Sequence, residues 1–211
     1  MAELSGTDLV CVRGERTVFT SLSFRLTSGG ALILAGPNGA GKSSLLRMMA
    51  GFLPPAAGVL TWDGVAVTND AEGHSRRVRY VAHVDAVKSP LTVAENLRTW
   101  AVLWGGSALA EERSREALVA FGIDRLAEVP GRYLSAGQKR RLALARLLVA
   151  PAPLWLLDEP RSGLDADAER RFDLAVERHR TSGGMVVMAL HGDCGPAGAR
   201  TLDLAGAAPR C

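Results

Sequence analysis

Three short apolar runs stand out along the chain because none of them alternates with polar residues. They are residues 31–35, 154–157 and 185–190. A strand with one wet face alternates polar and apolar residues, whereas a strand covered on both faces is apolar throughout. The pattern therefore predicts three strands of a parallel sheet that is covered by helices.

Each apolar run leads directly into residues of a kind that bind ligands or take part in catalysis. The first leads into Gly36, the second into Asp158 and Glu159, and the third into His191. In open α/β sheets, ligands bind beyond the carboxyl ends of the strands. We therefore expect one active site at this edge of the sheet.

The turn after the first run is glycine-rich and reads Gly36-Pro37-Asn38-Gly39-Ala40-Gly41-Lys42-Ser43, followed by Ser44. It fits the pattern G-x-x-x-x-G-K-[ST], in which backbone N–H groups and a helix N-terminus face phosphate oxygens. We expect this loop to bind ATP, with Lys42 on the β- and γ-phosphates and Ser43 as a ligand of Mg²⁺. Taken alone, the pattern also fits a glycine-rich turn that enters an ordinary helix.

Two neighbouring acids follow the second run. Asp158 is placed to hold Mg²⁺ through a water molecule, and Glu159 is placed to take a proton from an attacking water. The alternative is a polar strand end that leads into a turn at Pro160. The glycine-rich loop earlier in the chain favours the catalytic interpretation.

The segment from Leu134 to Gln138 predicts the start of a helix. Ser135 with Gln138 three residues later is the pattern of a capping box. Apolar residues then recur at helical spacing until Pro151 ends the helix. Gly137, in the first turn of this helix, has no side chain to cover the free backbone N–H groups, which are therefore open to an anion.

In their order, these motifs resemble those of the ATP-binding-cassette (ABC) ATPases, from about Leu9 to about His191. The segment from Leu134 to Gln138 matches the signature sequence of that family, and residues 162–165 form the loop that follows the acids. The resemblance implies an α/β fold with a P-loop NTPase core and a single domain over residues 1–211. A small antiparallel subdomain would contain residues up to about Thr27 together with 59–67, and a helical subdomain would be inserted at about 85–150.

The resemblance also implies roles and partners. Glu159 would be the general base, Asp158 the magnesium-associated acid, and His191 the residue that contacts the γ-phosphate. A second copy of the chain would close on the nucleotide and enclose two ATP molecules between the copies. The residues implied to contact the opposite copy or its nucleotide are Ser135, Gly137, Gln138 and Asp165.

Two positions depart from the family pattern. Val84, between His83 and Asp85, stands where the family carries a glutamine that senses the γ-phosphate and contacts the membrane partner. Valine can neither ligate a metal nor form a side-chain hydrogen bond. We hypothesise that Asp85 or His83 takes over this role, or that coupling is looser. Where the family stacks an aromatic ring on adenine, Arg13 could stack through its guanidinium plane, or it could be an ordinary surface residue.

Within the family, the chain is similar to the ATP-binding subunit of the haem exporter used in cytochrome c maturation. Segments 11–16, 82–83, 91–97, 134–146 and 154–160 carry this similarity. It implies integral membrane permease subunits as partners, haem as the cargo, and a peripheral location on the cytoplasmic side of the inner membrane. An ABC transporter subunit for another substrate is the alternative. A nucleic-acid clamp ATPase fits less well, because no sustained heptad repeat appears.

Composition bears on the location of the protein and on the kinds of partner it binds. In the 211 residues, no apolar run approaches the roughly 18–20 residues that cross a bilayer, and the first residues lack the pattern of a signal peptide. The net charge of +3 is modest, and the basic clusters at 76–79 and 139–141 are expected to be solvated or to contact a protein, not nucleic acid. Three cysteines without paired spacing fit a reducing compartment.

Two tryptophans fall at i and i+4 of the helix expected after residue 91. Trp100 and Trp104 therefore share one helix face. We expect both to be core residues. The alternative is a groove for a cytoplasmic helix of the membrane partner, since aromatic residues are common at interface anchors.

Overall fold

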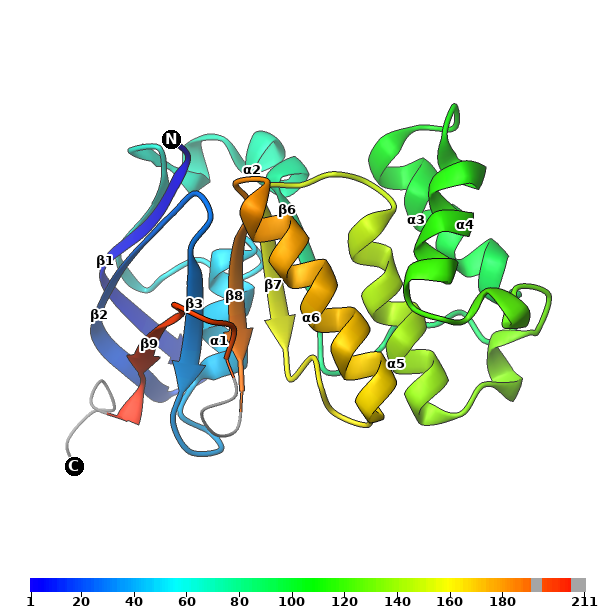
Figure 1. Ribbon diagram of the computed structural model, residues 1–211. Helices are drawn as coiled ribbons and strands as arrows, with labels where there is room; N and C mark the ends of the chain where they lie inside the picture. Colours follow the sequence, from blue (N-terminus) through cyan, green and yellow to red (C-terminus); the bar gives the residue numbers. More distant parts are fainter. Residues whose placement is uncertain (191–194, 206–211) are drawn as a thin grey trace. The chain divides into compact units, whose positions relative to one another are not determined.

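The computed structural model describes residues 1–190 and 195–205 of the chain (Figure 1). These residues form two compact units. The first, called the core unit, contains Met1–Ala82, Ala152–Glu159 and Glu177–Cys211, and the second, called the helical unit, contains His83–Pro151 and Pro160–Val176. Each unit is described by itself.

The core unit contains a four-stranded antiparallel sheet of order β2-β1-β4-β5. Its strands are β1 (Glu3–Arg13), β2 (Arg16–Thr27), β4 (Ala57–Trp62) and β5 (Val65–Ala66). Along β1 and β2, buried side chains recur between more exposed ones, as expected of a sheet with one covered face. The small antiparallel subdomain predicted from the sequence is confirmed.

A second, five-stranded sheet of the core unit has the order β6-β7-β8-β3-β9. Its strands are β3 (Ala31–Ala35), β6 (Val78–Val81), β7 (Leu154–Asp158), β8 (Met185–Ala189) and β9 (Arg200–Asp203). All of its pairings are parallel. Every residue of β7 and β8 is buried, so the continuous apolar runs do mark central parallel strands.

One apolar core joins both sheets through helix α1 (Lys42–Met49), which packs on β7 and β8. Leu45 and Leu46 of α1 are buried in the same cluster as Leu9 of the antiparallel sheet and Leu156 of the parallel sheet. A 3-10 turn, η1 (Val67–Asn69), and helix α2 (Ala71–Arg77) connect β5 to β6.

The helical unit contains α3 (Val93–Gly105), α4 (Ala110–Ala120) and α5 (Ala136–Ala145). Three 3-10 turns connect or extend them: η2 (Asp124–Leu126), η3 (Gly131–Tyr133) and η4 (Arg146–Leu148). Helix α4 contacts both α3 and α5. Helix α6 (Ala166–Thr181) begins in the helical unit and ends in the core unit.

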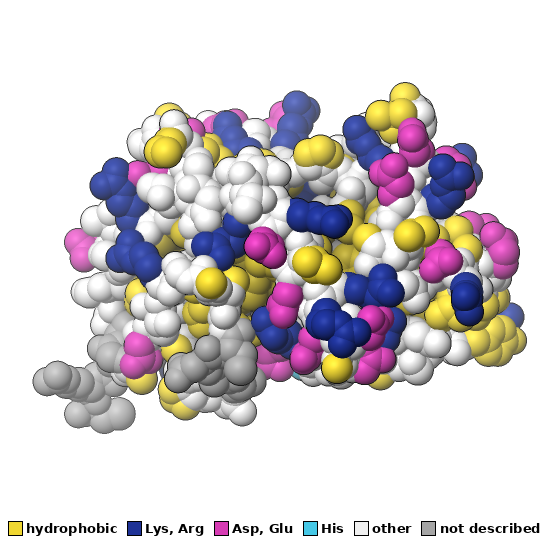
Figure 2. All heavy atoms as spheres, viewed as in Figure 1, with side chains coloured by type: hydrophobic (Ala, Val, Ile, Leu, Met, Phe, Trp, Pro, Cys, Tyr) yellow, Lys and Arg dark blue, Asp and Glu magenta, His cyan; other side chains and the backbone are white. Residues whose placement is uncertain are grey.

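Two of the basic residues expected to be solvated are buried. Arg79 and Arg140 are only 3% and 4% exposed, so the prediction of solvated clusters is wrong at these positions. A buried guanidinium needs hydrogen-bond acceptors around it. Arg79 finds them in the carbonyls of Arg76 and Val78, and Arg140 has partners that are described below. On the face drawn in Figure 2, basic and acidic side chains are interspersed.

The two tryptophans of α3 contact each other, but neither is fully buried. The ring centroids of Trp100 and Trp104 are 4.7 Å apart, and the guanidinium of Arg146 lies 4.9 Å from the Trp100 ring centroid. The prediction that both belong to the core is therefore wrong. A half-buried ring can pack on a cation and keep one edge in solvent.

Among residues 1–190 and 195–205, no helix combines the length and apolar character needed to cross a membrane.

The core unit contains a histidine that makes its stability depend on pH. His179 stacks on Trp155 at 3.9 Å, and burial lowers its pKa from 6.5 to about 4. Between these values the unfolded chain binds the proton and the folded chain does not, so stability is full above pH 6.5 and declines toward pH 4. We expect His179→Phe, which keeps a ring on Trp155, to flatten this decline in urea unfolding measured from pH 7 to 4.5.

His74 retains part of the decline in that variant, because burial lowers its pKa as well. If the free energy of unfolding of His179→Phe declined with falling pH as steeply as that of the wild type, His179 would not be a source of the pH dependence.

Candidate functional site

The glycine-rich loop follows β3 directly and ends in α1. Lys42, the first residue of α1, is 7% exposed, and its ammonium donates to the carbonyls of Gly36 at 2.6 Å and Pro37 at 3.2 Å. The loop thus curls around this cation. Ser43 lies exposed at the first turn of the helix.

Glycine is required at the junction of this loop with α1. Gly41 is the N-cap residue with φ 102°, a conformation that side chains rarely adopt, and a Cβ there would lie 2.5 Å from Val18 Cγ1. The first turn of α1 contains no acidic residue, and no side chain caps it. Its N–H groups and the positive end of the helix dipole are therefore available to an anion.

The two acids lie at the carboxyl end of β7. Asp158 is 5% exposed and pairs with Ala189 across the β7–β8 ladder. Glu159 follows with φ 48°, and its N–H donates to the Ala189 carbonyl at 3.1 Å. A positive φ is uncommon for a residue other than glycine and often accompanies functional sites.

The parallel sheet places these groups at one edge of the core unit. Strands β3, β8 and β7 are consecutive neighbours and run in the same direction, so their carboxyl ends meet there. The glycine-rich loop follows β3, and the acids end β7. His191, predicted at the end of the third strand, lies outside the described residues.

The signature segment lies in the helical unit, where the predicted capping box is confirmed. The Ser135 hydroxyl accepts from the Gln138 N–H at 3.2 Å, and the Gln138 side chain accepts from the Ser135 N–H at 2.9 Å. This reciprocal pair begins α5. Ser135, Gly137, Gln138 and Asp165 also line one pocket of the helical unit.

Helix α5 holds the loop that follows the acids through three contacts. Arg140 Nε donates to the Pro160 carbonyl at 3.1 Å, and Arg141 forms an ion pair with Asp165. Between them, Gly137 faces the Gly163 carbonyl so closely that a Cβ at residue 137 would lie 2.9 Å from that oxygen. The sequence predicted an open helix N-terminus at Gly137, and this close backbone approach is a second reason for glycine there.

Asp165 also begins helix α6. Its carboxylate accepts the Ala168 N–H at 2.9 Å, and this hydrogen bond, together with the nearby Arg141, lowers the pKa of Asp165. These contacts lie within the helical unit and leave the predicted role at a subunit contact untested.

The positions that depart from the family pattern differ in their surroundings. Val84 is 74% exposed, whereas Asp85 accepts a hydrogen bond from Arg140 at 2.9 Å. His83 and Arg13 are exposed. Exposure of Arg13 fits both alternatives, stacking on adenine and an ordinary surface position.

Sequence reasoning missed the arginines that organise the helical unit. Arg140 and Arg141 were grouped with Lys139 as a basic cluster, although the helical period places neighbouring residues on different sides of α5. Their partners, Asp85 and Asp165, are 55 and 24 residues away in the chain, and no local pattern indicates such pairs.

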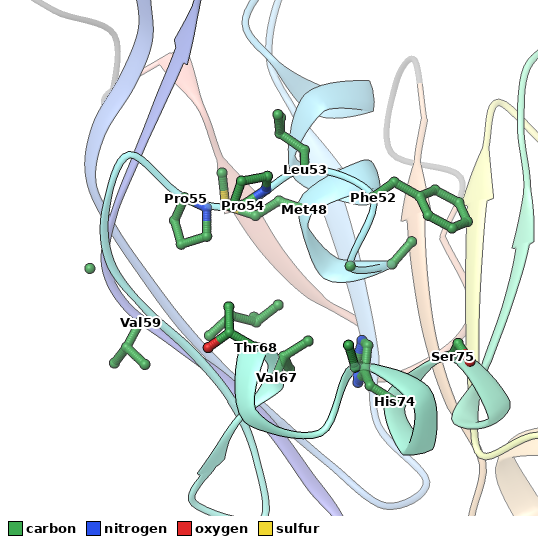
Figure 3. A pocket seen from close by; sticks show the side chains of 15 residues that line it. Met48, Phe52, Leu53, Pro54, Pro55, Val59, Val67, Thr68, His74 and Ser75 are labelled. Atoms are coloured by element: carbon green, nitrogen blue, oxygen red, sulfur yellow. The ribbon is translucent and has the colours of Figure 1, made fainter.

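A separate apolar cavity of about 360 Å³ lies in the core unit (Figure 3). Leu53, Pro54 and Pro55 form one side, and Val67 and His74 form the other. Its lining includes neither an arginine or lysine nor any residue of the glycine-rich loop. It therefore does not suit a triphosphate and is distinct from the site described above.

Comparison with known sequences identifies a family model and several named relatives that match most of the chain. A sequence model of the family described as "ABC transporter" matches residues 19–162. A Paramagnetospirillum magneticum protein named "Cytochrome c biogenesis ATP-binding export protein CcmA" is 53% identical over 201 residues, which are 95% of this chain and 93% of that protein. A Rhodospirillum rubrum protein of the same name is 54% identical over 208 residues, covering 99% of this chain and 88% of that one.

Solved structures are similar in fold. One described as "Structure of ATP binding subunit of ABC transporter" has a TM-score of 0.80 at 25% identity, covering 88% of this chain and 78% of that one. A Pyrococcus furiosus protein described as a putative ABC transporter ATP-binding protein has a TM-score of 0.84 at 23% identity, covering 98% of this chain and 100% of that chain. The second likeness concerns the fold alone.

The close approach at Gly137 yields a prediction. In an ordinary helix, Gly→Ala stabilises by roughly 1 kcal/mol. Here the added Cβ would push on the Gly163 carbonyl, so we expect Gly137→Ala to gain nothing or to lose stability in urea unfolding. The neighbouring exposed position serves as the control, where Ala136→Gly reports helix propensity alone. A gain near the full helix-propensity value in Gly137→Ala would show that the loop does not press on this residue.

Proposed function

The chain belongs to the ABC transporter family as an ATP-binding subunit, and from this premise we propose that it powers the export step of cytochrome c biogenesis, with haem as the cargo. The observation that carries the proposal is the identity of 53–54% to two named export proteins across nearly the whole length of both chains. The glycine-rich loop and the acid pair, at one edge of the parallel sheet, supply the chemistry that such a subunit needs.

We assign the binding of ATP to the residues around α1. The backbone N–H groups of the Gly36–Ser43 loop, apart from Pro37, which has none, and the Lys42 ammonium would contact the β- and γ-phosphates. Ser44 follows in the same turn. Lys42 already points into the loop, so it needs only to exchange two carbonyl acceptors for phosphate oxygens. A buried ammonium interacts strongly with a phosphate because little water screens it.

We assign hydrolysis to Glu159. Its carboxylate would accept a proton from the attacking water, whose oxygen forms the new bond to the γ-phosphorus as the bond to the leaving ADP oxygen breaks. The backbone hydrogen bond to Ala189 and the positive φ of Glu159 fix the backbone position from which its side chain extends. His191 would contact the γ-phosphate from the next strand.

The available donors suit magnesium. Ser43 offers a hydroxyl and Asp158 a carboxylate, and both are hard oxygen donors. Among the described residues, no group of three or more His, Cys, Asp or Glu side chains could hold a metal ion with protein ligands only. This fits an ion that takes its remaining ligands from phosphate and water. When bound, Mg²⁺ neutralises charge on the phosphates.

The signature segment implies a second copy of the chain. Ser135, Gly137 and Gln138 would close on the γ-phosphate held by the opposite copy, with Asp165 at the contact. Neither the P-loop nor the signature segment completes the phosphate cage alone, so hydrolysis would wait for closure. The membrane partners would be permease subunits, with this chain at the cytoplasmic face of the inner membrane.

A cassette subunit for a different cargo is the second candidate.

The nucleotide site yields a paired prediction. We expect Lys42→Ala to weaken binding of MgATP, because the cation at the phosphates is lost. We expect Glu159→Gln to retain binding and to lower kcat by about 100-fold or more, the usual contribution of a general base. Fluorescent-nucleotide binding and phosphate release separate the two effects. Full turnover in both variants would refute the assignment of the site.

The cargo assignment is tested by co-purification. We expect the tagged chain, isolated from its own membranes in mild detergent, to bring down integral membrane proteins of the cytochrome c maturation system. ATPase activity of that complex should respond to haem. Recovery of an unrelated permease would favour the second candidate and would leave the nucleotide site unaffected.

A further inference from the structure

Arg140 is a buried arginine whose directed bonds inside the helical unit include one to a backbone carbonyl and one to a carboxylate. It lies in the middle of α5 and is 4% exposed. Its Nε donates to the Pro160 carbonyl at 3.1 Å, and its terminal nitrogen donates to Asp85 Oδ1 at 2.9 Å. A planar guanidinium can hold two acceptors in fixed directions, and a lysine ammonium cannot reproduce that geometry.

The Pro160 end of this link adjoins the proposed general base. Glu159 precedes Pro160 directly, and its φ of 48° is a conformation that surrounding contacts must maintain. On its amino side, the Glu159 N–H bonds to Ala189. On its carboxyl side, the first backbone acceptor beyond its own peptide is the Pro160 carbonyl, which Arg140 holds.

The Asp85 end lies in the segment that departs from the family pattern. Val84 is exposed and its side chain has no polar group, whereas the side chain of the next residue, Asp85, is 22% exposed and points to Arg140. A nearby second arginine, Arg146, is also buried, and its pKa, about 10, is lowered by burial and raised by Asp85. Asp85 therefore supplies negative charge to a buried cationic region.

We propose that Arg140 is a positioning residue that connects Asp85 to the backbone after Glu159, so that the segment beside Val84 controls the alignment of the general base. Asp85 then acts through Arg140 and not by ligating magnesium or water itself. This inference rests on the proposed role of Glu159 and adds the contact by which that residue is aligned.

The link differs from the other contacts between α5 and the same loop. Arg141 and Gly137 contact Asp165 and Gly163, which lie farther along the chain from Glu159. Only Arg140, among the described contacts of α5, reaches both the residue after the general base and the segment after β6.

The test uses Arg140→Gln, Arg140→Lys and Asp85→Asn in the full chain. Misplacement of a catalytic group by about 1 Å can cost roughly 100-fold in rate. We expect kcat for MgATP to fall about 10- to 100-fold in both Arg140 variants, with KM and binding of a non-hydrolysable analogue changed less than about threefold. Asp85→Asn should lower kcat in the same direction, and the double variant Arg140→Gln/Asp85→Asn should be no slower than Arg140→Gln alone.

A matched control is Arg77→Gln, which removes another arginine–aspartate ion pair, to Asp70 at 2.7 Å, and neither of these residues is assigned to the nucleotide site or to the Arg140 link. It should leave kcat unchanged. Thermal unfolding of every variant separates positioning from folding: kcat is corrected for the folded fraction at the assay temperature.

Three results would overturn the inference: unchanged kcat in the Arg140 variants, losses explained by the unfolded fraction alone, or additive losses in the double variant. A wild-type chain without ATPase activity, or one indifferent to Glu159→Gln, would instead refute the proposed function. The two failures are therefore distinguishable.

Discussion

Parallel pairing of β3, β8 and β7 is the constraint on which the rest of the structure depends. Because the three strands run in one direction, whatever follows each of them emerges at the same edge of the sheet. Segments more than a hundred residues apart in the chain thereby meet: the glycine-rich loop after Ala35 and the acids that end at Glu159. The apolar core that fixes these strands is shared with α1 and the antiparallel sheet, so the position of the P-loop is set by the packing of the whole core unit.

Much of this edge could be predicted from the sequence because its signals are local. Buried parallel strands are apolar without interruption, a phosphate loop needs its glycines at fixed positions, and a capping box needs only residues three apart. Each rule involves a few consecutive residues, and the structure follows each of them at β3, at Gly41 and at Ser135.

What the sequence could not indicate involves pairs distant in the chain. Arg140 appeared as one of three adjacent cations, and its burial depends on Asp85 and Pro160, which only the fold brings near. Trp100 and Trp104 were expected in the core because they share a helix face, yet both are half-buried, and the Arg146 guanidinium lies over the Trp100 ring. Gly137 was explained by an anion alone, since nothing local shows that the Gly163 carbonyl approaches it.

Helix α6 distinguishes one of the passages between the two units from the others. The chain passes between the two units four times, after residues 82, 151, 159 and 176, and the last passage lies within α6. Sharp kinks arise at proline, glycine or an inserted group, and the sequence of α6 contains neither proline nor glycine. The other three passages, after residues 82, 151 and 159, lie outside any helix. One of them is the peptide between Glu159 and Pro160, so the residue that would activate water is the last of the core unit before the chain enters the helical unit.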